Sequence, residues 1–233
     1  MSYTNVMHEE HHLKSSQFIT DIVIGMSDGL TVPFALAAGL SGAVGSTGVI
    51  TTAGIAEIVA GSVAMGLGGY LAGKTEQEHF DAELKREYEE VETVPDKEKA
   101  EIKEIFAGMG LNERLQEEVA EEISKDKDKW VDFMMRYELG LEKPDIYRAR
   151  KSAVTIGSSY AVGGIIPLLP YFFVDSPRQG LIYSCICTIL CLFIFGYFKC
   201  KVTGQEPFIG ALKITGIGAL AAAAAFTVAK FIV

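Results

Sequence analysis

Two acidic residues and a methionine stand deep within long apolar stretches of the sequence, where they could bind a cation. Asp28 lies near the centre of the first stretch, and Glu57 is the only charged residue of the second. A carboxylate placed in lipid costs about 3 kcal/mol or more, so an intramembrane acid indicates a function by default. Met65, about two helical turns after Glu57, adds a thioether on a similar helix face. These three residues predict an ion path through a membrane.

The surroundings of Asp28 support this interpretation, although each residue also has a structural alternative. Gly25 and Gly29 bracket Asp28 and predict close approach by another helix. Pro33 is expected to kink the helix. Asp21 lies on the same face but is assigned to the membrane interface rather than to the ligands. In the alternative, Asp28 only bonds a neighbouring helix and the methionine only fills space.

A second set of acids lies in a charged segment, the acidic insert. Residues 74–151 contain 23 of the 30 acidic and 15 of the 21 basic residues. Neighbouring like charges cost a few tenths of a kcal/mol per pair unless a cation lies between them. The spacing places several glutamates on shared helix faces, and two thioethers and a further acid follow: Glu83, Glu87, Glu90, Glu98, Glu101, Glu104, Met134, Met135 and Glu138. Oxygen with sulfur donors favours a divalent transition metal over calcium or magnesium. In the alternative, these are solvated helix faces.

Five apolar stretches are long enough to form the membrane-spanning helices that would position the intramembrane residues. Each has about 20 or more mostly apolar residues. The stretches are 17–40, 49–73, 152–174, 179–198 and 207–233. The sequence therefore predicts an all-α, polytopic membrane protein with five transmembrane helices and a cytosolic helical domain inserted between the second and third.

The acidic insert is expected to be helical, because it is rich in Glu, Lys, Leu and Ala. Pro95 suits the first turn of a helix, and Gly108 and Gly110 indicate a break. No breaker precedes Lys74, so the second span is expected to continue directly into the insert. Helices are predicted near 74–93, 95–107, 111–126 and 128–140.

The positions of the basic residues near the spans predict the orientation of the chain. Seven of them fall on one side of a five-span plan: Lys14, Lys74, Arg148, Arg150, Lys151, Lys199 and Lys201. By the positive-inside rule that side is cytosolic, and the C-terminus is lumenal. The predicted organisation is a cytosolic tail (1–16), two spans (17–73), an acidic metal-binding domain (74–149) and three spans (150–233).

Composition excludes several other classes of protein. The charge partition rules out a simple soluble enzyme, and a net charge of −9 disfavours nucleic acid as a partner. The four cysteines crowd one apolar run without metal-ligand spacing, so they are expected to be packing residues. The polar N-terminus does not read as a cleavable signal peptide.

Two membrane motifs resemble the vacuolar iron transporter family, in its plant-like form. The run DGLTVPFALAAGLSGA from Asp28 resembles the family's first span, and AEIVAGSVAMGLGGYLAG from Ala56 resembles its second. The Glu-rich insert and the five-span plan also match, so the resemblance covers essentially the whole chain.

The resemblance implies a proton-coupled antiporter that moves ferrous iron from the cytosol into the vacuole for storage or detoxification. It implies a homodimer in the vacuolar membrane, protons and divalent metal ions as partners, and no enzyme activity or prosthetic group. Mn²⁺, Co²⁺ and Zn²⁺ are further candidate substrates. The metal ligands that it implies are Asp28, Glu57, Met65, Glu87, Glu90, Glu98, Glu101, Met134, Met135 and Glu138.

Two alternatives of other classes remain open at this point. A carboxylate-type iron oxidase needs a Glu-x-x-His step twice, and the insert has it once, at Glu76 and His79. A membrane-anchored acidic scaffold leaves Asp28 and Glu57 unexplained.

Overall fold

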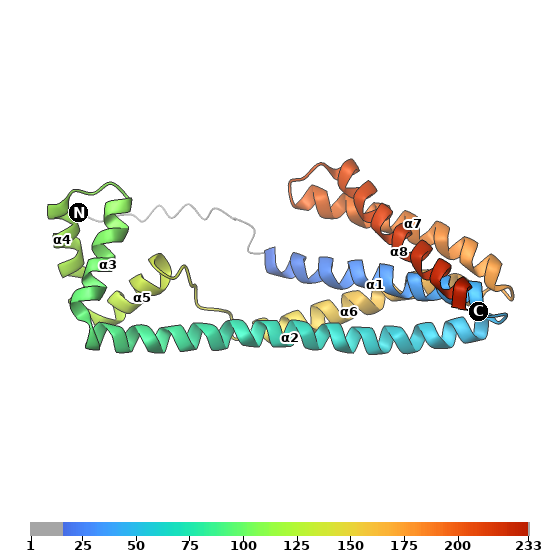
Figure 1. Cartoon of the computed structure of the whole chain (residues 1–233), viewed down its shortest axis with the longest axis horizontal. Coiled ribbons are helices and arrows are strands. Elements are labelled where there is room, and N and C mark those ends of the chain that lie inside the picture. The colour runs from blue at the N-terminus through green and yellow to red at the C-terminus, as the bar shows by residue number, and fades with distance from the viewer. Residues whose placement is uncertain (1–15, 233) are drawn as a thin grey trace, which may run out of the picture. The chain divides into compact units, whose positions relative to one another are not determined.

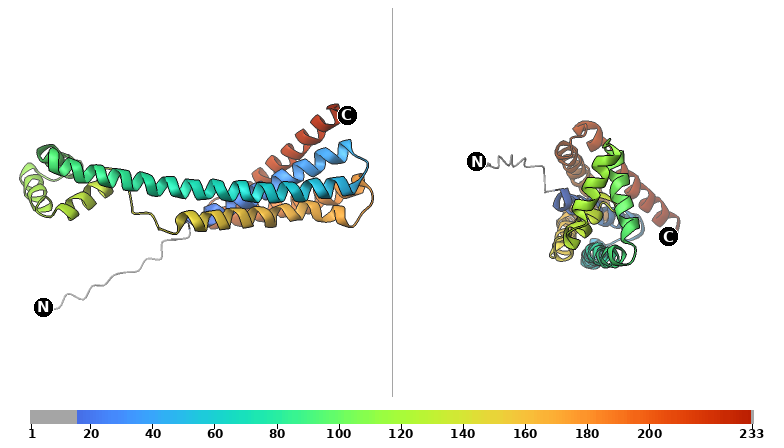
Figure 2. Two further views of the ribbon diagram at one scale, coloured as in Figure 1. Left: turned by 90° about the horizontal axis from the view of Figure 1, so that it is seen from below. Right: turned by 90° about the vertical axis from the view of Figure 1, so that its left-hand side faces the viewer.

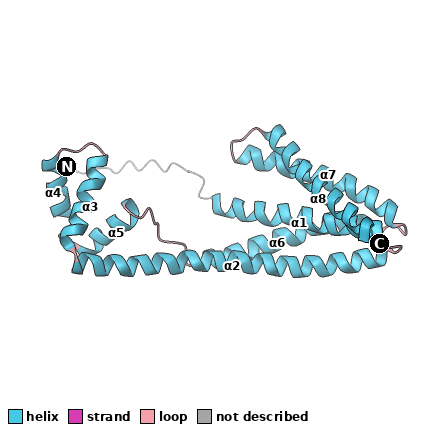
Figure 3. Ribbon diagram, viewed as in Figure 1, coloured by secondary structure: helices cyan, strands magenta, loops and turns pink. Residues whose placement is uncertain are grey.

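The computed structural model describes residues 16–232, and these residues are almost entirely helical, with no strand among them (Figures 1 and 3). The helices are α1 (Ser16–Ala43), α2 (Thr47–Thr93), α3 (Pro95–Gly108), α4 (Glu113–Ile123), α5 (Lys127–Tyr137), α6 (Arg148–Leu168), the 3-10 helix η1 (Leu169–Phe172), α7 (Pro177–Val202) and α8 (Pro207–Ile232). The predicted all-α class is confirmed. The first fifteen residues, most of the predicted tail, lie outside the described part.

The chain divides into two compact units. Among the described residues, the span unit comprises 16–70 and 150–232, and the insert unit comprises Leu71–Ala149. Helix α2 runs without interruption from the span unit into the insert unit, as the lack of a breaker before Lys74 predicts.

Five of the described helices are long and apolar enough to cross a membrane, as predicted. They are α1, α2, α6 together with η1, α7 and α8. The third differs from the prediction of one continuous stretch over 152–174, because α6 ends at Leu168 and η1 follows. Pro170 has no N–H to continue the α-helical bonding, so the chain tightens into a 3-10 turn.

Glycines let the helices of the span unit approach closely. A Cβ on Gly25 or Gly29 of α1 would lie 2.3 Å from a backbone oxygen of α6, so only glycine fits there. The predicted close approach at these two positions is confirmed, and the approaching helix is α6. Gly66 of α2 and Gly157 of α6 also face each other, and these two helices run side by side in Figure 2. Helix α6 therefore packs against both α1 and α2.

Further polar contacts and helix packing complete the span unit. Helices α1, α7 and α8 pack against one another. The Tyr171 hydroxyl of η1 lies 2.8 Å from Ser41 Oγ of α1, and Ser184 of α7 donates a hydrogen bond to the Pro167 carbonyl oxygen at 2.7 Å. These bonds link the chain around the α6–η1 break to two neighbouring helices. The cysteines Cys185, Cys187, Cys191 and Cys200, all on α7, are free thiols.

The insert unit has an apolar core of its own, formed by α2, α3, α4 and α5. Its buried members are Phe80, Val91, Ile102, Ala120, Trp130, Val131, Met134 and Met135. Two side-chain caps fix the helix starts: the Asn112 side chain accepts a bond from Leu115 N at 3.1 Å, and the Asp126 side chain accepts one from Lys129 N at 3.3 Å. Helix α4 therefore begins after residue 112 rather than at 111, and α5 begins at Lys127.

Candidate metal sites

Glu57 is held in the span unit by a tyrosine from a neighbouring helix. Its Oε1 accepts a hydrogen bond from the Tyr160 hydroxyl of α6, and its Oε2 is buried with no hydrogen-bond partner among the described residues. An unsatisfied buried carboxylate oxygen is costly unless a proton or a cation approaches it. Glu57 therefore has one oxygen fixed in place and one that remains able to take a cation.

Tyr160 lies between the two helices that carry the intramembrane acids. Its side chain is 2% exposed, and Gly61 of α2 makes room for its ring, since a Cβ there would lie 2.5 Å from ring atoms. Its carbonyl oxygen touches Gly29 of α1, the residue directly after Asp28. The hydroxyl also interacts electrostatically with Asp28 as well as with Glu57. The fold thus bonds Glu57 to the Tyr160 side chain and sets the Tyr160 backbone against Gly29, the neighbour of Asp28.

Tyr160 was not predicted as a functional residue, because it lies in the third apolar stretch, which contains no charged residue. The available signal was a phenol in a span, since a buried tyrosine hydroxyl usually has a hydrogen-bond partner. The other predicted residues of the path are placed as follows. Asp28 and Met65 are partly buried, and Asp21 is 3% exposed and thus enclosed by protein. A ligand role for Met65 stays a prediction.

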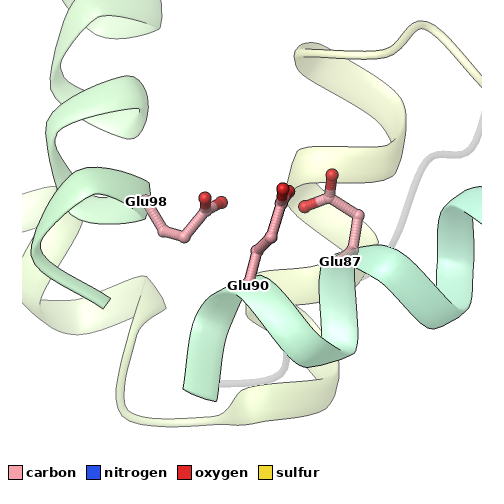
Figure 4. A group of neighbouring side chains, drawn as sticks. All are labelled: Glu87, Glu90 and Glu98. Carbon is pink, nitrogen blue, oxygen red and sulfur yellow. The ribbon is translucent and has the colours of Figure 1, made fainter. Parts of the chain in front are cut away.

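Carboxylates from three parts of the insert unit gather into two groups that share one residue. Among residues 16–232, ligand atoms of Glu87, Glu90 and Glu98 lie within 4.8 Å of one another, and so do those of Glu98, Glu101 and Glu138. Figure 4 shows Glu87 and Glu90 on α2 and Glu98 on α3, with the three carboxylates directed toward one another. We call these five residues the acid groups.

The bend between α2 and α3 brings these glutamates together. Val94 precedes a proline, which disfavours the helical conformation, and its φ and ψ of −133° and 49° end α2. Pro95 then opens α3, as predicted. The chain turns within one residue, so Glu98 in the first turn of α3 faces the last two turns of α2.

The centre of the acid groups is buried and strongly anionic. Glu98 is 0% exposed, and neither of its oxygens has a hydrogen-bond donor in the described part of the chain. Glu87 is 2% exposed, and its Oε2 likewise has no such partner there. Burial, helped by nearby carboxylates, raises the pKa of each from 4.5 to about 7, and burial also raises the pKa of Glu138. A bound divalent cation would relieve both the desolvation and the repulsion.

The remaining predicted residues of the insert are placed in different surroundings. Met134 and Met135, 0% and 2% exposed, belong to the apolar core, so packing accounts for both, and metal ligation by them stays a prediction. Glu83 pairs with Arg86 at 3.8 Å, and Glu104 is exposed. Neither belongs to the acid groups.

Comparisons with known proteins agree with the resemblance in the sequence. A family model described as the VIT family matches residues 19–230. The chain is 52% identical over 223 residues to "Vacuolar iron transporter 1" of Tulipa gesneriana, which covers 96% of this chain and 90% of the relative. It is 50% identical to "Vacuolar iron transporter 1" of Arabidopsis thaliana, over 97% of this chain and 90% of the relative. "Protein CCC1" of Saccharomyces cerevisiae is 40% identical, over 92% of this chain and 69% of the relative.

Proposed function

The chain belongs to the VIT family, a family of transporters rather than enzymes, and we propose that it moves ferrous iron from the cytosol into the vacuole in exchange for protons. The names of the two plant relatives support iron as the substrate and the vacuolar membrane as the location. The five candidate spans support a multi-pass membrane protein.

The observation that carries the proposal is the half-satisfied carboxylate of Glu57. Tyr160 fixes one oxygen and leaves the other buried without a described partner. Such an oxygen is stabilised by a metal ion or by a proton, but one position cannot hold both. Loading the metal from one side and a proton from the other would couple the two flows. Asp28 adds a second anionic donor near Tyr160, and Met65 is the proposed soft donor that favours a transition metal.

The acid groups are proposed to capture metal in the cytosol before it reaches the span unit. Their five carboxylates form an oxygen-rich, anionic site with Met134 and Met135 in the adjoining core. Mn²⁺, Co²⁺ and Zn²⁺ fit the same donors. These glutamates lie beyond the apolar stretch 49–73, too far along the chain from the bilayer to form the translocation site, so they are proposed to capture the ion rather than conduct it.

Orientation and assembly complete the proposal. By the positive-inside rule, the basic residues flanking the spans support an orientation with the N-terminus and residues 74–149 in the cytosol and the C-terminus in the lumen. The chain would work as a homodimer in the lipid bilayer, which could bring Asp28 of one subunit near its counterpart in the other.

Uptake of Fe²⁺ by proteoliposomes containing the full chain tests this function. We expect Glu57→Gln to abolish uptake, because the amide can neither ionise nor attract the metal, while the helix still inserts. Glu206→Gln, a matched change at an exposed glutamate between α7 and α8, should transport normally. Uptake at the wild-type rate by well-folded Glu57→Gln protein would contradict the proposal.

A further inference from the structure

Two basic side chains lie among the carboxylates of the acid groups. Lys97 Nζ is 2.9 Å from Glu101 Oε1 and 3.9 Å from Glu98 Oε1. Arg86 Nε is 3.2 Å from Glu90 Oε1, and its NH1 is 3.8 Å from Glu83 Oε2. Both cations also interact electrostatically with Glu138. Between them they contact members of both acid groups.

Helix stability does not explain the position of Lys97. It lies in the first turn of α3, where the helix dipole disfavours a positive charge. Its partner Glu101 is four residues later, the less favourable orientation for an ion pair within a helix. The carboxylates that surround it are therefore the better explanation for a lysine here.

We propose that Lys97 and Arg86 are internal counter-ions that partly offset the negative charge of the acid groups when no metal is bound and lower their metal affinity by competing with the incoming cation. This inference rests on the proposed capture of metal by the acid groups. It assigns an affinity-setting role to two residues that are not themselves ligands.

The exposure of the two cations makes the exchange feasible. The side chains of Lys97 and Arg86 are 63% and 64% exposed, so each can move into water when a metal ion enters. Glu98, by contrast, is enclosed and stays in place as the acid shared by both groups. Because these cations compete with the incoming metal ion, the site binds the metal less tightly and releases it faster. Such release suits a site that passes its metal on.

The expected size of the effect is modest. Exposed ion pairs are weak, so removing one competing cation should tighten metal binding by a factor of about 1.4 to 5. The gain should shrink at high ionic strength, because salt screens the interactions of exposed charges. A purely structural role would not produce this salt dependence.

Fe²⁺ binding to the purified full chain, measured under anaerobic conditions by competition with a chromogenic chelator, tests the inference. A fourfold variant, with glutamine in place of the glutamates at positions 87, 90, 98 and 101, identifies the binding component that belongs to the acid groups. That component is the part of the Fe²⁺ binding that this variant loses. Lys97→Gln and Arg86→Gln should tighten it, and Lys97→Arg should keep wild-type affinity because it keeps the charge. Lys85→Gln is the matched control, because Lys85 pairs at 3.7 Å with Glu89, outside the acid groups.

The outcomes separate this inference from the function on which it rests. Tighter binding by the two Gln variants at low salt, with unchanged binding by Lys85→Gln and Lys97→Arg, would support it. If the fourfold variant removes a component but Lys97→Gln and Arg86→Gln leave its affinity unchanged or weaker, the counter-ion role is refuted while metal capture stands. If the fourfold variant removes no component, both are overturned.

Discussion

Replacing Glu98 by glutamine should stabilise the metal-free insert unit at alkaline pH. The Glu98 side chain is 0% exposed, and no hydrogen bond from any described residue reaches its oxygens. Burial first, and then Glu101 and Glu90, raise the pKa of Glu98 to about 7, and only Lys97 opposes the shift. Glutamine keeps the shape and the helix propensity but removes the charge.

The sign and the size of the effect follow from this pKa. Because the folded-state pKa of Glu98 is above the ordinary value of 4.5, its contribution to stability is fully present below pH 4.5. That contribution is lost as the pH rises through about 7. The difference between the folded-state pKa and the ordinary pKa corresponds to about 3 kcal/mol of stability. Solvent screening and the unbonded amide of glutamine reduce the gain in stability expected from the substitution to about 1–2 kcal/mol. For a unit of this size each kcal/mol raises the melting temperature by roughly 4–8 °C.

The chain contains its own reporter for this measurement. Trp130 is the only tryptophan in the sequence, and it is 5% exposed in the core of the insert unit. Its fluorescence during heating of the full chain, with a chelator present, therefore follows unfolding of that unit. At pH 8 Glu98→Gln should melt above the wild type, and the difference should narrow toward pH 5. The exposed Glu104 on the same helix provides the control Glu104→Gln, which should melt with the wild type. A Glu98→Gln protein that melts at or below the wild type at pH 8 would refute the reasoning.

Three further predictions use transport by proteoliposomes. Met65→Leu should keep the packing but reduce uptake of Fe²⁺ and other transition metals, and equal uptake of every metal tested would make this residue a packing residue only. Tyr160→Phe removes the donor to Glu57, and a hydrogen bond to a charged group contributes about 1.5–3 kcal/mol, so uptake should fall roughly tenfold or more. An unchanged rate would show that the bond is dispensable. The fourfold glutamine variant should transport poorly at low iron and recover at high iron, because Asp28 and Glu57 remain; loss of uptake at every iron concentration would instead make the insert part of the gate.

The elements of the fold follow from local sequence features. Apolar stretches of sufficient length predict the five spans, and Pro95 predicts the start of α3. The predicted break near Gly110 is present, with this glycine at a φ of 89°. The ends of helices were less predictable. Helix α6 stops at Leu168 before Pro170, within a stretch that carries no charged residue.

The composition of the candidate sites was only partly predictable. Helical spacing places Glu87 and Glu90 on one face, but their meeting with Glu98 depends on the sharp turn at Val94. Spacing within one helix cannot reveal such a contact. The same limit applies to Tyr160, whose bond to Glu57 joins residues 103 positions apart.

Fe²⁺ flux coupled to proton flux is the most direct test of the central claim. Proteoliposomes with an acidic interior should take up Fe²⁺ through the full chain, and the interior pH should rise as the metal enters. Dissipating the pH gradient should slow this uptake, and Asp28→Asn should abolish both the metal flux and the pH change. Fe²⁺ uptake that proceeds at the same rate without a pH gradient, and without any proton movement, would contradict the account.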